Sequence, residues 1–339
     1  MRRFTHVVST LAVAAALLDG RGPASAQAPV SPRVVEFAIP TPGAFPHDPA
    51  VDARGRVWYT DQANSRIGRL DPETGAFTDQ PTPSAGAGPH GITVGVDGTV
   101  WYTGNANGTI GRVDPATGAI REYRLPAEAR DPHTPILAAG YLWFTVQASN
   151  LIGRLDPATG AAQLVRVPTP RARPYGIVPA PDGTLWVALF GTNKLARLDP
   201  SSGEPTEIAL PDPLARPRRL VVDDSGTVWY TDYARGFLGA YVPKTGRFTE
   251  WPTPTPRGAP YGIAIGPDGR IWFEEATSGD MVAFDPRDGS MERIGIPTRG
   301  AIVRHMVVDQ ARGRIWLALS GTGRIGRIDV PPRRAPTPG

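Results

Sequence analysis

The chain has 339 residues, and its hydrophobic content of 40% is sufficient for a packed core, while 39 glycines and 38 prolines predict many turns. Cysteine is absent, which excludes disulfides, thiolate metal ligands and thiol nucleophiles. The net charge is +4, and no block of Lys and Arg with interleaved aromatic residues occurs. We therefore expect no nucleic-acid partner.

The N-terminus has the pattern of a secretory signal peptide. Arg2 and Arg3 precede an apolar run over 7–18, and small residues over 24–26 form a cleavage site. We expect residues 1–26 to be a signal peptide that is cut near Ala26, and the protein to be periplasmic or secreted. The apolar run is shorter than the roughly 20 residues of a membrane span, and no later run is longer, so no membrane span is expected.

A repeat with a period of 42 to 44 residues follows, marked by tryptophan. Each unit holds short runs rich in Val, Ile, Thr and aromatic residues, separated by Asp-Gly and Asp-Pro turns, which predicts four antiparallel strands. Four strands in this period are typical of a β-propeller blade, with the tryptophan filling the space between neighbouring blades. The marking residues are Trp58, Trp101, Trp143, Trp186, Trp229, Trp272 and Trp316.

The two ends of the repeat complement each other. The last unit stops at Val330 without a closing strand, whereas residues 34–42 resemble a closing strand with no unit before them. We predict an all-β, seven-bladed β-propeller of four-stranded antiparallel blades over 27–330, closed by the strand at 34–42, which leaves no exposed edge. Residues 331–339 are expected to be a disordered tail, and a closed ring without an obligatory interface predicts a monomer.

One position on the first strand of each unit concentrates polar side chains. First strands surround the central channel of a propeller, so these side chains should meet at a channel mouth. The histidines fall on four consecutive blades and form an arc, although they could equally cap strands or plug the channel. Counting back from each tryptophan places at this position His47, His90, His133, Tyr175, Arg218, Tyr261 and His305.

The repeated phrases PHGI, PYGI, DGxxWFT, NxIGR and IPTP resemble those of the virginiamycin B lyase (streptogramin lyase) family, over residues 33–330. The resemblance implies a seven-bladed propeller and a Mg²⁺-dependent C–O lyase that opens an ester-linked cyclic peptide by elimination. In that family one histidine binds the metal, a carboxylate precedes a second, basic histidine by two residues, and another carboxylate follows a tryptophan. The metal acidifies the C–H beside the ester carbonyl, and a histidine with a pKa near 6.5 removes the proton.

In chain order, the family's residues correspond to the last two units. His305 then matches the base, but the metal-binding histidine and the two carboxylates correspond to Tyr261, Val303 and Ser320. This register predicts no metal site.

The second and third units match the resemblance better. His90 corresponds to the metal-binding histidine, and Asp131 precedes the base His133 by two residues. Gln147 takes the place of the last carboxylate and offers a neutral oxygen. His133 and His305 are therefore the candidate catalytic residues, and His90, Asp131 and Gln147 the candidate Mg²⁺ ligands.

Further polar residues are expected at the same mouth. His305 and His47 form a third candidate cluster with Asp61, and Glu274 and Glu275 follow Trp272. Three functions remain open: the lyase, a non-catalytic propeller that binds a small molecule, peptide, glycan or protein partner at the mouth, and a metal-dependent lactonase or esterase.

Overall fold

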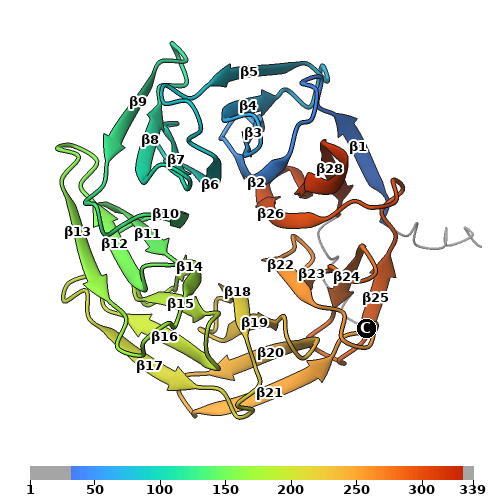
Figure 1. Cartoon of the computed structure of the whole chain (residues 1–339). Coiled ribbons are helices and arrows are strands. Elements are labelled where there is room, and N and C mark those ends of the chain that lie inside the picture. Colours follow the sequence, from blue (N-terminus) through green and yellow to red (C-terminus); the bar gives the residue numbers. More distant parts are fainter. Residues whose placement is uncertain (1–31, 331–339) are drawn as a thin grey trace, which may run out of the picture. The chain divides into compact units, whose positions relative to one another are not determined.

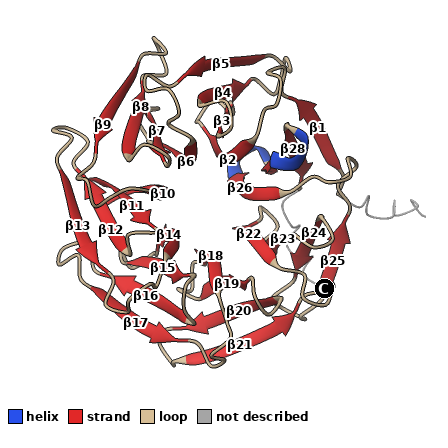
Figure 2. Ribbon diagram, viewed as in Figure 1, coloured by secondary structure: helices blue, strands red, loops and turns tan. Residues whose placement is uncertain are grey.

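A computed structural model describes residues 32–330, so the predicted signal peptide and tail lie outside the described residues. Within this part, strands β1 to β28 form seven four-stranded antiparallel sheets arranged around one axis (Figure 1). The helical segments of the described chain are two single 3-10 turns, Gln310–Arg312 and Ser320–Thr322 (Figure 2). The predicted seven-bladed propeller is confirmed.

The blades follow one another along the chain. Blades 1 and 2 consist of β2 (Pro46–Val51), β3 (Val57–Asp61), β4 (Arg66–Leu70), β5 (Phe77–Pro81), and β6 (Pro89–Val94), β7 (Val100–Gly104), β8 (Thr109–Val113), β9 (Ile120–Arg124). Blades 3 and 4 consist of β10 (Pro132–Ala138), β11 (Tyr141–Val146), β12 (Leu151–Leu155), β13 (Ala162–Arg166), and β14 (Pro174–Pro179), β15 (Leu185–Leu189), β16 (Lys194–Leu198), β17 (Pro205–Ala209). Blades 5 and 6 consist of β18 (Pro217–Val222), β19 (Val228–Asp232), β20 (Phe237–Val242), β21 (Arg247–Pro252), and β22 (Pro260–Ile265), β23 (Ile271–Glu275), β24 (Asp280–Phe284), β25 (Met291–Ile294). Blade 7 consists of β26 (Val303–Asp309), β27 (Arg314–Leu319), β28 (Arg324–Asp329) and the N-terminal β1 (Val34–Ala38).

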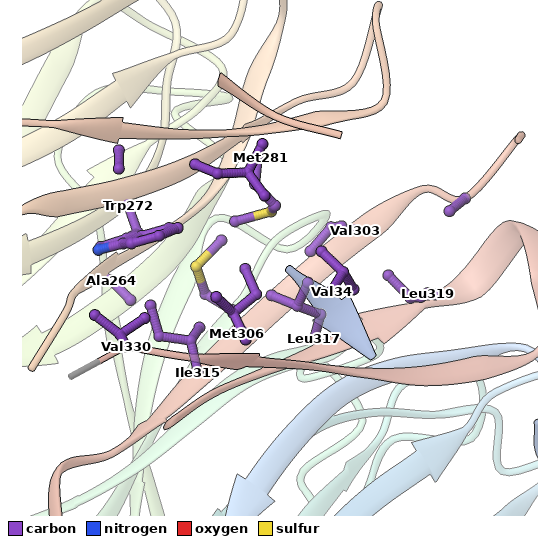
Figure 3. Close-up of a cluster of buried hydrophobic side chains, with 14 residues drawn as sticks. Val34, Ala264, Trp272, Met281, Val303, Met306, Ile315, Leu317, Leu319 and Val330 are labelled. Atoms are coloured by element: carbon purple, nitrogen blue, oxygen red, sulfur yellow. The ribbon is translucent and has the colours of Figure 1, made fainter. Parts of the chain in front are cut away.

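Strand β1 closes the ring as predicted, pairing with β28 from Val34↔Ile328 to Ala38↔Arg324. The strand covers five residues of the predicted 34–42. Figure 3 shows Val34 among buried side chains of blades 6 and 7, including Trp272. The closing strand is therefore held by an apolar core as well as by backbone hydrogen bonds.

The seven repeat tryptophans are buried and fill the space between blades, as expected. Trp101 packs with Leu142 and Phe144 of blade 3, and Trp316 packs with Val57 and Tyr59 of blade 1. Each tryptophan thus seals the interface with the following blade, and the last one seals the ring.

Every first strand contains a β-bulge near its start. In blade 1, Pro46 pairs with Asp61 but the next paired residue is Pro49, opposite Tyr59. His47 and Asp48 are therefore both outside the ladder, and a bulge can turn consecutive side chains toward the channel. The first strands of all seven blades have the same irregularity.

A threonine two residues after the tryptophan supports this bulge in blades 1, 2, 3 and 5. The Thr60 hydroxyl accepts the backbone N–H of Asp48 at 3.1 Å and donates to the carbonyl of His90 in the next blade at 2.7 Å. The repeated WYT or WFT phrase therefore satisfies the bulge and links neighbouring blades.

The register corrects one prediction, because His305 lies one residue beyond the position of the other histidines. Trp316 pairs with Val307, whereas Trp58 pairs with Ala50, so Arg304 takes the place that His47 has in blade 1. The connection from the tryptophan's partner to the tryptophan is one residue longer in blade 7, where the 3-10 turn Gln310–Arg312 is inserted. A count from the tryptophan therefore slips by one residue.

Candidate functional site: the divided channel

The two bulge residues of each blade form two tiers around the axis. We call the first the upper tier, because it is nearer the strand starts, and the second the lower tier. The upper tier consists of His47, His90, His133, Tyr175, Arg218, Tyr261 and Arg304; the lower tier consists of Asp48, Gly91, Thr134, Gly176, Arg219, Gly262 and His305.

Three histidines of the upper tier lie ring against ring with their planes tilted by 40° and 48°, and we call this row the histidine stack. The ring centroids are 3.5 Å apart for His47 and His90 and 3.6 Å apart for His90 and His133, and Tyr175 continues the stack at 4.0 Å from His133. The three imidazoles are buried, with 3% to 4% exposure of each residue. The structure therefore brings together the histidines that the sequence placed on blades 1 to 3, but inside the channel rather than on its open rim.

An ion pair crosses the channel beneath this stack. The Arg219 guanidinium of blade 5 donates to both carboxylate oxygens of Asp48 in blade 1 at 3.1 Å, and Asp48 also contacts His47 Nδ1 at 2.8 Å. Both members of the ion pair are buried, with exposures of 1% and 2%. We call this pair the brace, because it joins blades on opposite sides of the axis.

The other half of the upper tier is aromatic and cationic. The Tyr175 and Tyr261 hydroxyls form a hydrogen bond, and the Arg218 guanidinium lies 3.7 Å from the ring centroid of Tyr261. Phe190 and Tyr233 also surround this guanidinium, with ring centroids at 4.9 and 4.4 Å. Cation–π attraction to these rings therefore stabilises the Arg218 guanidinium, as a carboxylate does in an ion pair.

Burial sets the protonation of the histidines. Burial lowers the pKa of His90 and His133 well below the ordinary value, and nearby positive charge, including that of Arg219, lowers it further. Burial also lowers the pKa of His305 to about 3. Burial lowers the pKa of His47 as well, against the opposing effect of Asp48. The imidazoles are therefore neutral at pH 7.

The brace holds the only charges in the lower tier. Burial raises the pKa of Asp48, but Arg219 and the contacts with His305 and His47 outweigh burial and keep that pKa well below its usual value. Asp48 is therefore ionised and neutralised by Arg219.

Glu274 replaces the bulge-supporting threonine in blade 6. It is fully buried, and its two carboxylate oxygens have no hydrogen bond of standard geometry with residues 32–330. Burial raises its pKa to about 8, against smaller opposing effects from the Val303 backbone N–H and from Arg218 and Arg304. The side chain is therefore mainly protonated at pH 7.

The second strands of blades 1 and 6 each end in a carboxylate that accepts hydrogen bonds from a mouth loop. Asp61 accepts the backbone N–H of Phe45 at 3.0 Å and the side-chain amide of Asn64 at 2.8 Å. Glu275 likewise accepts the backbone N–H and the hydroxyl of Thr255, each at 2.7 Å. Asp61 and Glu275 are therefore committed to loop structure.

Asp131 and Gln147 lie at the mouth of blade 3. One Asp131 oxygen accepts the backbone N–H of Ala148 at 2.7 Å, and the other has no hydrogen-bond partner among residues 32–330. Burial raises the pKa of this carboxyl, against hydrogen bonds from nearby backbone N–H groups. Gln147 is the first residue after β11.

The arrangement does not fit the predicted Mg²⁺ site of His90, Asp131 and Gln147. Among residues 32–330, the one group of three His, Asp or Glu ligand atoms within 4.8 Å of one another is His47, Asp48 and His90, which excludes Asp131. In that group the carboxylate is already neutralised by Arg219. Mg²⁺ prefers several oxygen ligands, and a fixed guanidinium beside the only carboxylate opposes a second cation.

A basic hollow opens above Arg218, at the mouth between blades 4 and 5. The hollow has a volume of about 520 Å³, and its lining includes Arg171, Arg173, Arg216 and Phe190. The Arg173 guanidinium lies 5.8 Å from the ring centroid of Phe190, and the Arg218 guanidinium contacts the same ring. Across 32–330 neither these three arginines nor Arg218 forms an ion pair. We call this feature the arginine hollow.

Sequence reasoning missed the brace and the three arginines that line the hollow. Arg219 follows Arg218 directly, and Asp48 follows His47, so recognising that the bulge exposes two consecutive residues would have identified both. The phrases RARPY and LARPR, on successive units, were the available signal for the arginine hollow.

Fold and channel define a seven-bladed propeller with an axial polar site. The chain belongs to the Virginiamycin B lyase family, whose family model matches residues 26–198 and 161–333. The comparison with curated proteins gave no significant match. Family membership confirms the predicted resemblance.

Solved structures agree with this assignment. Selenomethionine-substituted virginiamycin B lyase from Staphylococcus aureus is 26% identical with a TM-score of 0.82, covering 88% of this chain and 100% of that chain. A catalytically inactive histidine-to-alanine variant of virginiamycin B lyase from that organism, crystallised with quinupristin, gives the same values. A chain of Kuenenia stuttgartiensis hydrazine synthase, 14% identical with a TM-score of 0.72 and covering 86% of this chain and 97% of its own, shares the fold alone.

Proposed function

We propose that this member of the family is a non-catalytic propeller that binds an organic anion with a planar or aromatic part in the arginine hollow. The observation that carries the proposal is a hollow lined by Arg171, Arg173, Arg216 and Phe190, in which the three arginines have no ion-pair partner in the described chain. Arg173 and Arg218 both lie over the Phe190 ring. Guanidinium groups bind carboxylate or phosphate in a forked geometry, and an aromatic ring favours a planar neighbour.

The lyase and lactonase alternatives receive less support from the site. In blade 7 the upper-tier position holds Arg304, and His305, the base in that register, lies in the lower tier. In blades 2 and 3, His90 and His133 are neutral and stacked, but no second acidic residue joins them in a ligand group within the described chain. Neither register assembles a base beside an oxygen-rich cation site.

Isothermal titration calorimetry with phenyl phosphate tests the proposed function. We expect the wild-type protein to bind phenyl phosphate more tightly than inorganic phosphate, because the phenyl ring contacts Phe190. Arg173→Gln should weaken the binding of phenyl phosphate at least tenfold. The matched control is Arg197→Gln, an arginine of the same blade that is paired with Asp182 at 2.9 Å, and it should bind as the wild type does.

Two results would overturn the proposal. One is equal binding by the Arg173→Gln and Arg197→Gln variants. The other is Mg²⁺-dependent opening of a cyclic depsipeptide to a dehydrated product that is lost in His133→Ala, which would restore the lyase hypothesis. Water added to the product instead would support the lactonase.

Export and oligomeric state are further proposals. We propose a monomer that is exported after cleavage near Ala26. Sedimentation and N-terminal sequencing of the exported protein test them.

A further inference from the structure

A second cavity lies in the channel on the opposite side of the brace from the histidine stack. It has a volume of about 260 Å³ and is lined by first-strand residues of six of the seven blades. The lining begins at the lower tier and continues to Val51 and Val178, at or near the ends of their strands. We call it the far cavity. The first strands that line it surround the axis in Figure 1.

The walls of the far cavity are apolar. They include Ile92, Ile177, Leu220 and Met306, which are buried with exposures of 6% or less. The wall residues nearer the strand ends, such as Val178, are partly exposed, so a ligand can enter from that side.

The floor is polar but carries no net charge. Asp48 and Arg219 neutralise each other, and Thr93, Thr134 and His305 are the other polar side chains of the lining. His305 Nδ1 is buried without a hydrogen-bond partner among the described residues. A charged ligand would meet a floor whose only charges are already paired, whereas a neutral polar group finds an unpaired nitrogen.

The size of the cavity limits the ligand. A protein cavity of about 150 Å³ holds benzene, so a space of this volume accommodates a molecule of about two rings. We propose that the far cavity is a second binding site, for a neutral, mostly apolar molecule of this size with one hydroxyl or carbonyl group that pairs with His305. This site is separate from the arginine hollow.

Binding of 2-naphthol, measured by ligand-observed NMR and calorimetry, tests this second site. We expect the wild-type protein to bind 2-naphthol at least tenfold more tightly than 1-naphthalenesulfonate, which has the same rings and a charge. Val178→Phe should weaken 2-naphthol binding at least tenfold by filling the cavity near its opening. Val35→Phe, on the exposed strand β1, is the matched control and should have no effect.

The polar contact has its own test. His305→Phe should abolish the preference for 2-naphthol over naphthalene, while melting temperature and circular dichroism report whether each variant is folded. Binding by Arg173→Gln should equal that of the wild type, which separates this site from the proposed function. The proposal is wrong if the wild type does not bind 2-naphthol, or if Val178→Phe and Val35→Phe bind it equally.

Discussion

The two ends of the channel differ in how their charges are compensated. At the strand-start mouth, three arginines line a hollow with Phe190 and form no ion pair in the described chain, whereas the Arg219 guanidinium in the brace is paired with both carboxylate oxygens of Asp48. The hollow is lined by residues that precede the first strands, and the brace by residues of the bulges. Unpaired charge at one end favours an anion, and paired charge under apolar walls at the other favours a neutral molecule.

Removal of half of the brace is the most disruptive way to test this difference. Arg219→Met leaves Asp48 ionised and buried without its partner, which costs about 3–5 kcal/mol of unfolding free energy. Urea denaturation at pH 7 measures this loss. The double variant Asp48→Asn/Arg219→Met removes both charges and should recover most of it; a loss below about 1 kcal/mol in the single variant would contradict the brace.

Glu274 provides the next largest effect. Its pKa is about 8 in the folded protein and 4.5 in a free side chain, so the folded state binds the extra proton between these values. This contribution is complete below pH 4.5 and is lost as the pH rises toward 8. Glu274→Gln should therefore match the wild type near pH 5 and exceed its unfolding free energy by about 3 kcal/mol at pH 7.5. Parallel stability curves for the two proteins would refute this.

The histidine stack predicts an acid-side effect with the opposite sign. Burial in the folded protein lowers the pKa of these imidazoles below the ordinary value of 6.5, so the unfolded chain binds more protons when the pH falls below 6.5. Each histidine then costs up to about 1.4 kcal/mol of stability per pH unit. Urea denaturation between pH 6.5 and 5 measures how the unfolding free energy changes with pH. This slope should be smaller for His133→Gln than for the wild type, by the equivalent of about one proton. An unchanged slope would mean that His133 is protonated in the folded protein.

Salt should affect ligand binding at the two ends of the channel differently, and this effect is smaller than those above. Raising sodium chloride from 50 to 500 mM should weaken phenyl phosphate binding about fivefold, because the arginine hollow is open to solvent. Binding of 2-naphthol should not weaken, since its site has no unpaired charge. Titrations at both salt concentrations measure the difference, and equal salt dependence would place both probes at one site.

The fold was predictable because its signals repeat. The tryptophan period gave the number of blades, and the incomplete last unit identified the role of β1, which does pair with β28. Each tryptophan packs against its own blade and the next one, so a pattern within one or two units was sufficient to predict the blades.

The site was less predictable for two physical reasons. The longer connection before Trp316 moves His305 to the lower tier, and the only sign of this one-residue shift in the sequence is the longer step from Trp272 to Trp316. The brace joins residues that are 171 apart, and only closure of the ring brings them together. The carboxylate that lies close to His47 and His90 is Asp48, which was not among the predicted Mg²⁺ ligands and is paired with Arg219.

A crystal of the protein soaked with phenyl phosphate and 2-naphthol together shows directly whether the two ends of the channel bind ligands of different charge. We expect phosphate oxygens among Arg171, Arg173 and Arg216 at the mouth, and 2-naphthol beyond the brace with its hydroxyl at His305. Both probes on the same side of the Asp48–Arg219 pair, or phenyl phosphate absent from the arginines, would contradict it.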